Sequence, residues 1–242
     1  MAGPSHGIGP DDIVTLDRAA VVARLLAGIL HDVNNSLLVI SGTTEILDGD
    51  PPSPPALAEG LARIRQCSTS AAAAVAEVLA FARGDLAERG PVDLHQLAAR
   101  ALAFRAYSLR RARVSTVITT ADEASGFVEG NAVLLLQAIL GLLINAEQAL
   151  AGEADGRIDV NVGMEQDRVC LRVIDNGPGV APEHRARVFD PFFTTRRRDE
   201  SQGLGLAAAS AIARSHGGAV TVEETASGAS LVLSLPPFDR RR

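Results

Sequence analysis

One histidine of the sequence has the neighbours that a nucleophile needs. His31 is followed directly by Asp32, and Asn35 comes one helical turn later on the same helix face. A carboxylate beside an imidazole can fix its tautomer and accept its proton while the other ring nitrogen attacks. An ordinary solvent-exposed histidine is the simpler alternative. A metal site is disfavoured, because no second histidine, cysteine or glutamate lies at ligand spacing.

A carboxylate and two glycines follow an apolar run in the second half of the chain. Asp175 ends this run, and Gly177 and Gly179 come after it. A buried carboxylate here can accept a hydrogen bond from an exocyclic amine, and glycines let the backbone approach a flat ring. The same residues also occur in tight turns. The pattern therefore indicates a nucleotide base only in combination with other motifs.

Two more motifs have groups that suit the phosphates of a nucleotide. Gly203, Leu204 and Gly205 precede an alanine-rich helix, whose first N–H groups can bind phosphate oxygens. Asn145 lies in an apolar helical stretch and can offer its carbonyl oxygen to Mg²⁺. Each also has an ordinary explanation, since glycines are common before helices and a helical asparagine usually caps a helix or faces water.

His31 lies in a stretch of the sequence with a heptad pattern, which predicts the helix that positions it. Apolar or small residues alternate in steps of three and four along residues 15–48 and again along 57–83, separated by a Gly/Pro-rich stretch at 49–55. This predicts two helices in an antiparallel hairpin, and their uncovered apolar stripes favour a dimeric four-helix bundle. His31 follows the seam residue Leu30, so it lies about 100° off the stripe and is expected to face solvent.

The pattern changes after residue 90, where short β-type runs alternate with helical stretches. Strands are predicted at 114–119, 157–162, 169–174, 219–223 and 230–235, and helices at 94–111, 132–150 and 204–216. The fold class is therefore α+β, a helical hairpin followed by an α/β sandwich with helices on one face of a mixed sheet. The predicted domains are a flexible N-terminus at 1–14, the hairpin at 15–90, the sandwich at 91–238 and a tail at 239–242.

The composition of the chain limits which kinds of partner it can bind and in which cellular compartment it is expected. The 23 Lys and Arg against 29 Asp and Glu give a net charge of -6, which offers no broad basic surface to nucleic acid or anionic lipid. Cys67 and Cys170 alone do not make a disulfide framework, which favours a reducing cytoplasm. The longest apolar stretch, 133–144, is interrupted and shorter than the ~18–20 residues of a membrane span. We expect a cytoplasmic chain with a protein or small-molecule partner.

The run His31-Asp32-Val33-Asn34-Asn35 in a heptad helix resembles the H-box of sensor histidine kinases, particularly the nitrogen-regulatory type. The resemblance implies that His31 is phosphorylated, that Asp32 is the base and that Asn35 positions water for a phosphatase reaction. It also implies a homodimer that passes phosphate to an aspartate of a response-regulator receiver domain. One departure is Ser36, where many members have a proline that bends the helix.

The other motifs resemble, in order and spacing, the ATP-binding domain of the same family, a Bergerat-type fold. They are Asn145, Asp175-x-Gly177-x-Gly179, the run FDPFF at 189–193, and Gly203-Leu204-Gly205-Leu206. The resemblance implies that Asp175 reads adenine, that Asn145 holds Mg²⁺, and that the glycines shape the ATP pocket. It also implies a mobile lid at 182–202, in which Thr194, Thr195 and Arg196 approach the phosphates.

Two departures from the family pattern keep a rival hypothesis open. Gly141 stands where the family has a first asparagine, and Ser201 where it has a first glycine. A non-enzymatic phosphotransfer module with a relic ATP domain would tolerate both changes. The kinase hypothesis instead predicts weakened ATP binding that Gly141→Asn improves. A third alternative, an Hsp90-like ATPase, leaves the heptad helix with His31 unexplained.

Overall fold

The computed structural model describes residues 9–48, 54–83, 88–120, 126–196, 202–223, 225 and 227–239. The chain divides into two compact units. One contains residues 22–85, and the other combines residues 1–21 with residues 86–242.

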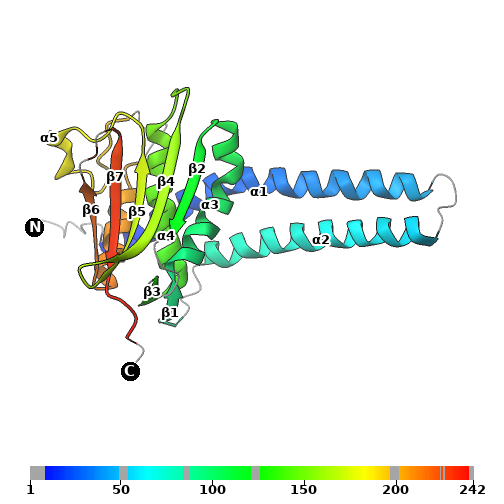
Figure 1. Cartoon of the computed structure of the whole chain (residues 1–242), viewed down its shortest axis with the longest axis horizontal. Coiled ribbons are helices and arrows are strands. Elements are labelled where there is room, and N and C mark those ends of the chain that lie inside the picture. Colours follow the sequence, from blue (N-terminus) through cyan, green and yellow to red (C-terminus); the bar gives the residue numbers. More distant parts are fainter. Residues whose placement is uncertain are drawn as a thin grey trace, which may run out of the picture. The chain divides into compact units, whose positions relative to one another are not determined.

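Two antiparallel helices form the helical unit, and the first of them begins before it, in the larger unit. Helix α1 spans Pro10–Asp48 and α2 spans Pro54–Arg83, and Figure 1 shows α2 running back along α1. The hairpin is thus confirmed: Leu47, near the end of α1, lies 3.0 Å from a Cβ built on Gly60 of α2. Many large apolar side chains of the hairpin are exposed, including Leu30 at 60% and Ile46 at 74%.

Helix α1 begins at Pro10, whereas the heptad pattern predicted a start near Thr15. Residues 10–14, which were expected to be flexible, are therefore helical. The local sequence accounts for the early start. Proline is favoured in the first turn of a helix, and Asp11 and Asp12 complement the positive end of the helix dipole. Asp12 Oδ2 also accepts a hydrogen bond from Gly9 N at 3.0 Å.

The larger unit is a layer of helices on a mixed sheet. Its five strands are β2 (Ser115–Thr120), β4 (Arg157–Glu165), β5 (Arg168–Asp175), β6 (Ala219–Glu223) and β7 (Ala229–Leu235), in the order β2-β4-β5-β7-β6. Only β2 and β4 pair in parallel. The helices are α3 (Leu94–Arg111), α4 (Ala132–Ala149), α6 (Gly205–Ser215) and the short α5 (Pro182–Arg185). All five predicted strands and the mixed sheet are confirmed. A ribbon of β1 (Gly90–Asp93) and β3 (Phe127–Gly130) was not predicted.

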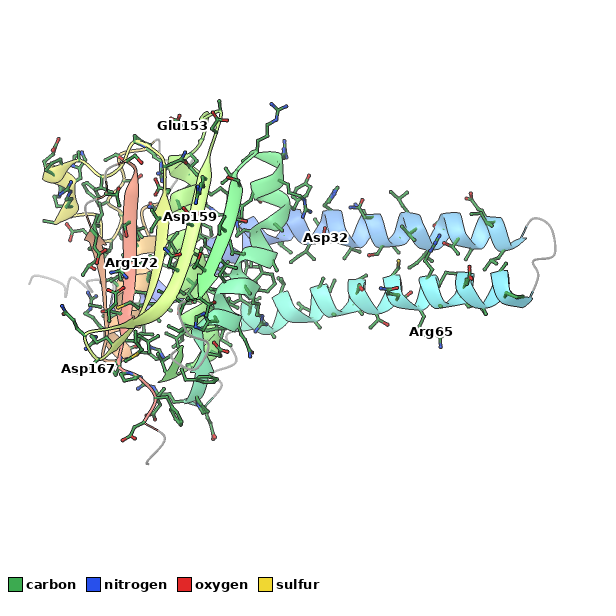
Figure 2. The ribbon with its side chains drawn as sticks, in the orientation of Figure 1. Asp32, Arg65, Glu153, Asp159, Asp167 and Arg172 are labelled. Carbon is green, nitrogen blue, oxygen red and sulfur yellow. The ribbon has the colours of Figure 1, made fainter. Side chains whose placement is uncertain are left out.

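The sheet presents one apolar face and one polar face. In β5, Val169, Leu171 and Val173 are buried, whereas Arg172 is part-exposed and pairs with Glu165 and Glu223. Figure 2 labels Arg172 on β5 and Asp159 on β4. Because strand side chains alternate, this pattern places Asp175 on the same face as the buried residues.

Helix α4 is the core helix of this unit. Eleven of its residues are buried, and Arg105 of α3 pairs with Glu147 of α4 at 2.7 Å. Among the described helices, α4 is also long and apolar enough to cross a membrane, but 61% of it is buried inside the protein, as expected for a core helix.

A buried histidine fixes the start of α4. His216 is 5% exposed, and its Nε2 accepts a hydrogen bond from the N–H of Asn131, the N-cap of α4, at 3.0 Å. Its Nδ1 lies 2.8 Å from the carbonyl of Ile212 and donates to it. The bond from Asn131 requires an unprotonated Nε2, so the ring is neutral with its proton on Nδ1. Burial lowers the pKa of His216; the hydrogen bond to Ile212 raises it in part, and Arg89 lowers it further.

This histidine predicts a loss of stability in acid. The unfolded chain takes up a proton as pH falls through about 6.5, whereas the folded protein resists it, so the stability present above that pH is lost below it. We expect the melting temperature to fall by a few degrees more between pH 7.5 and 5.5 in the wild type than in His216→Gln. Scanning calorimetry at both pH values tests this, and parallel falls in the two proteins would contradict it.

Candidate ATP-binding site and phosphoacceptor histidine

Asp175 is the buried acid of the candidate nucleotide site. It ends β5, is 2% exposed, and its Oδ1 accepts hydrogen bonds from Gly177 N at 3.0 Å and Ala229 N at 3.4 Å. Burial raises the pKa of Asp175, and these two N–H groups and the Arg196 guanidinium lower it in part. Both bonds use Oδ1, so Oδ2 can accept a hydrogen bond from the amine of a ligand. A buried acceptor of this kind suits an adenine ring.

Two glycines of the predicted motifs are required by the backbone around the site. Gly179 has φ +76°, and a Cβ there would lie 2.7 Å from the carbonyl oxygen of Gly228. Gly203 has φ +66°, and its Cβ would lie 2.6 Å from the carbonyl oxygen of Phe193. Gly203 also accepts a hydrogen bond from Phe192 N at 2.9 Å. The glycine before α6 therefore packs directly on the FDPFF turn, and a larger residue would separate the two.

Polar side chains share one face of α4, which is otherwise buried and apolar. Gln137, Asn145 and Gln148 lie on this face with Gly141, at spacings of about one and two turns. Asn145 is part-exposed. The described residues contain no group of three or more His, Cys, Asp or Glu side chains that could hold a metal. A single amide oxygen fits Mg²⁺, because Mg²⁺ usually keeps several waters and is held mainly by substrate phosphates.

Arg196 joins the predicted lid to this face of α4. Its Nη1 donates to Gln148 Oε1 at 2.9 Å, and its Nη2 lies 3.5 Å from the carbonyl of Asn145. Its backbone N–H donates to Thr194 Oγ1 at 3.1 Å, whereas Thr195 is exposed. The structure thus places Arg196 beside Asn145, as the nucleotide hypothesis requires. Gln148 was missed by sequence analysis, although its position three residues after Asn145 was a usable signal.

Leu204 and Gly205 serve the packing of α6. The side chain of Leu204 is 4% exposed and belongs to an apolar cluster with Ile13, Ala207 and Ala208. Only its backbone is therefore available to a phosphate. No side-chain hydrogen bond caps α6, whose first residue is Gly205. This leaves the start of the helix suited to an anion.

Gly141 allows α4 and α6 to touch. A Cβ on Gly141 would lie 2.9 Å from the carbonyl oxygen of Gly205 and 3.8 Å from Ala209 Cβ. An asparagine here would push against a backbone atom of α6. This contact gives Gly141→Asn a steric cost that the expectation of improved ATP binding did not include.

We now expect Gly141→Asn to destabilise the larger unit. Overpacking of a buried contact typically costs about 1–3 kcal/mol, which is several degrees of melting temperature for a domain of this size. Thermal denaturation without nucleotide measures this cost. Gly42 is the matched control, because it is also helical and a Cβ there meets nothing within 4 Å. A Gly141→Asn variant as stable as Gly42→Asn would contradict the packing argument.

The phosphoacceptor candidate lies on α1, in the helical unit. His31 is part-exposed, and Asn35 Nδ2 donates to its Nε2 at 2.9 Å. The structure therefore brings these two residues together, as predicted. Asp32 is exposed next to them, and Figure 2 labels it on α1. The bond to Asn35 occupies the lone pair of Nε2, so this nitrogen can attack a phosphorus atom only after Asn35 moves away.

Two family models match these two regions. Residues 22–87 match "His Kinase A (phospho-acceptor) domain", and residues 130–239 match "Histidine kinase-, DNA gyrase B-, and HSP90-like ATPase". The chain belongs to the histidine kinase family. The sequence resemblance to sensor histidine kinases is thereby confirmed, and the matched ranges contain His31 and Asp175.

Two curated relatives, a histidine-protein kinase and a sensor protein, match nearly all of the chain. It is 31% identical to the signal transduction histidine-protein kinase AtoS of Escherichia coli (strain K12), over 91% of this chain and 36% of that protein. It is 28% identical to the C4-dicarboxylate transport sensor protein DctB of Rhizobium meliloti (strain 1021), over 93% of this chain and 36% of that protein. The chain thus spans about a third of the length of these relatives.

Solved structures of the family show the same fold. The catalytic domain of histidine kinase ThkA matches with a TM-score of 0.57 and 24% identity, over 64% of this chain and all of that one. ThkA in complex with the response regulator protein TrrA matches with a TM-score of 0.53 and 20% identity, over 94% of this chain and 65% of that one.

Proposed function

We propose that this chain is the catalytic core of a two-component histidine kinase that autophosphorylates His31 from Mg-ATP. It then passes the phosphate to an aspartate of a response-regulator receiver domain. The observation that carries the proposal is the presence of two sites in one family member: the Asn35–His31 pair and the buried Asp175 beside Arg196. One site supplies a nucleophile, and the other supplies the features of an ATP pocket.

Each residue of the two sites has its own role in the proposed reaction. Asp175 accepts the adenine amine, and Arg196 exchanges its contact with Gln148 for the phosphates. Asn145 provides the oxygen that holds Mg²⁺, which neutralises phosphate charge when bound. Nε2 of His31 attacks the γ-phosphorus in line while Asp32 accepts the ring proton, and ADP leaves. Asn35 then orients water in the phosphatase reaction with the phosphorylated regulator.

The assembly proposed is a cytoplasmic homodimer formed by the hairpin at 15–90, with the ATP-binding domain at 91–238. It is supported by the exposed apolar side chains on both helices, among them Leu30, Leu37 and Leu38 on α1 and Leu57 and Leu61 on α2. A second hairpin would bury these side chains, which a water-exposed helix pair cannot do. Sedimentation at micromolar concentration should show a dimer. A monomer that still transfers phosphate would contradict the assembly.

The relic alternative has lost part of its support. Gly141 counted as a defect of the ATP site, but its place against Gly205 gives it a packing role. The direct test incubates the chain with γ-labelled ATP and Mg²⁺, and then adds a panel of receiver domains. We expect an acid-labile and alkali-stable label that moves to a receiver. A chain that binds no ATP at millimolar concentration would leave the phosphotransfer module as its function.

A further inference from the structure

The start of α1 is held against the ATP-binding unit by a buried amide. Gln137 of α4 is completely buried, and its Nε2 donates to the carbonyl of Val14 at 2.8 Å and to Asp17 Oδ2 at 2.9 Å. Its Oε1 accepts a hydrogen bond from Arg18 Nε at 3.1 Å. These partners all come from one turn of α1, so a side chain deep in the core helix is satisfied by the N-terminal segment.

An apolar contact accompanies these hydrogen bonds. Ile13, 7% exposed, packs with Leu204, Ala207 and Ala208 at the start of α6, and Val14 lies against the same cluster. Figure 1 shows the beginning of α1, in blue, beside α6, in orange. The segment therefore presents Ile13, Val14, Asp17 and Arg18 to the surface between α4 and α6. We call residues 10–21 the docking segment.

The polar and apolar groups between the docking segment and the larger unit are typical of a reversible contact. The apolar part is small, and a buried amide lies beside it. If the docking segment moved away, water would satisfy Gln137, Asp17 and Arg18, so the undocked surface would carry little penalty. A permanent core contact is usually built from apolar side chains, which resist such exposure.

The docked segment also lies next to the candidate phosphate site. Gln137 is one turn before Gly141 and two turns before Asn145 on the same face of α4. Asp17 Oδ1 lies 3.8 Å from the Cβ position of Gly205, at the start of α6. The docked segment thus places a carboxylate at the start of α6, whose uncapped N–H groups suit a phosphate. Two anions near one helix N-terminus oppose each other.

We propose that the docking segment is an intramolecular inhibitor, which closes on the surface around Gln137 and opposes the binding of Mg-ATP. This inference rests on the proposed function for its nucleotide. Binding and docking are then coupled, and the coupling must be reciprocal. Weaker docking strengthens ATP binding, and ATP loosens the docking segment.

The experiment measures both halves of this coupling in the full chain. Calorimetry gives the Kd of Mg-ATP for the wild type, Asp17→Asn and Gln137→Ala, and amide hydrogen exchange follows residues 13–21 with and without Mg-ATP. Asp17→Asn removes the negative charge but keeps an oxygen that can accept the hydrogen bond from Gln137. Gln137→Ala removes all three hydrogen bonds to α1, and alanine preserves the helix because it has the highest helix propensity. Asp11→Asn is the matched control, because it removes the same charge from an exposed position of the segment.

We expect Kd to fall about fivefold or more in both variants and to stay unchanged in the control. Exchange in residues 13–21 should become faster in Gln137→Ala, and faster in the wild type when Mg-ATP is added. Mg-ATP that slows this exchange or leaves it unchanged, or variants that bind ATP no more tightly than the control, would overturn the inference. If neither the wild type nor any variant binds ATP, the proposed function and the inhibition both fail. Hydrogen exchange in Gln137→Ala without nucleotide then decides only whether the segment docks through Gln137.

Discussion

Replacing His31 by glutamine should reduce the incorporation of labelled phosphate from ATP to background. A glutamine side chain has no ring nitrogen that can attack phosphorus and form a phosphoramidate. The effect is expected to be complete, because the phosphorylated atom itself is lost. The affinity for ATP should not change, since Asp175 and Asn145 belong to the other compact unit. Label retention on gels and calorimetry with Mg-ATP measure the two quantities.

A second histidine provides the control for this experiment. His95, at the start of α3, is part-exposed and forms a contact with Thr120 at 3.1 Å. His95→Gln should incorporate label at a rate close to that of the wild type. The label on the wild type should be lost in acid and retained in alkali. Full labelling of His31→Gln, or a label that survives acid, would rule out His31 as the phosphoacceptor.

Replacing Asp175 by asparagine should weaken the binding of ATP without lowering the stability of the fold. The variant keeps Oδ1 for the N–H groups of Gly177 and Ala229 but exchanges an acceptor oxygen for a donor, which cannot bind the adenine amine. Loss of a hydrogen bond to a charged group costs about 1.5–3 kcal/mol, so the affinity for ATP should fall by about one to two decades. Calorimetric titration with Mg-ATP measures this loss.

The same substitution should not lower the stability of the nucleotide-free protein. Because burial raises the pKa of Asp175, the folded protein binds its proton more tightly than the unfolded chain does. The stability that this group contributes is present at low pH and is lost as pH rises through its folded pKa. At neutral pH the ionised carboxylate is thus a cost, which asparagine removes. We expect the melting temperature at pH 7.5 to stay equal or rise in Asp175→Asn.

Asp159 is the matched control for this prediction. It lies on β4, opposite β5, and pairs with Arg157 at 2.9 Å on the exposed strand surface. Asp159→Asn should keep the affinity for ATP, because it lies away from the apolar face that carries Asp175. If Asp175→Asn melted several degrees below both proteins, its loss of ATP binding would be a consequence of misfolding, and the assignment of Asp175 as the adenine acceptor would lose its support.

Much of the architecture could be predicted from the sequence, because it depends on local patterns. The heptad repeat predicted the hairpin of α1 and α2, and the alternation of apolar residues predicted the five strands of the main sheet. The order of Asp175, the FDPFF run and Gly203 predicted the ATP-binding family, which the family models confirm. The pairing of Asn35 with His31 followed from helical spacing alone. In each case the residues that interact are close in sequence or form a periodic pattern.

Other features were decided only by contacts between distant parts of the chain. The sequence suggested that Gly141 weakens the ATP site, but the approach of α6 shows that it relieves a steric conflict with Gly205. In the sequence, Gln137 is a polar residue in an apolar helix, and the fold places it against Val14 and Asp17, more than a hundred positions earlier. Helical periodicity shows which face of α4 carries Gln137, but it contains no information about the segment that covers this face. Only tertiary packing, which sets whether a buried polar group is satisfied and by which partner, could determine that the start of α1 docks there.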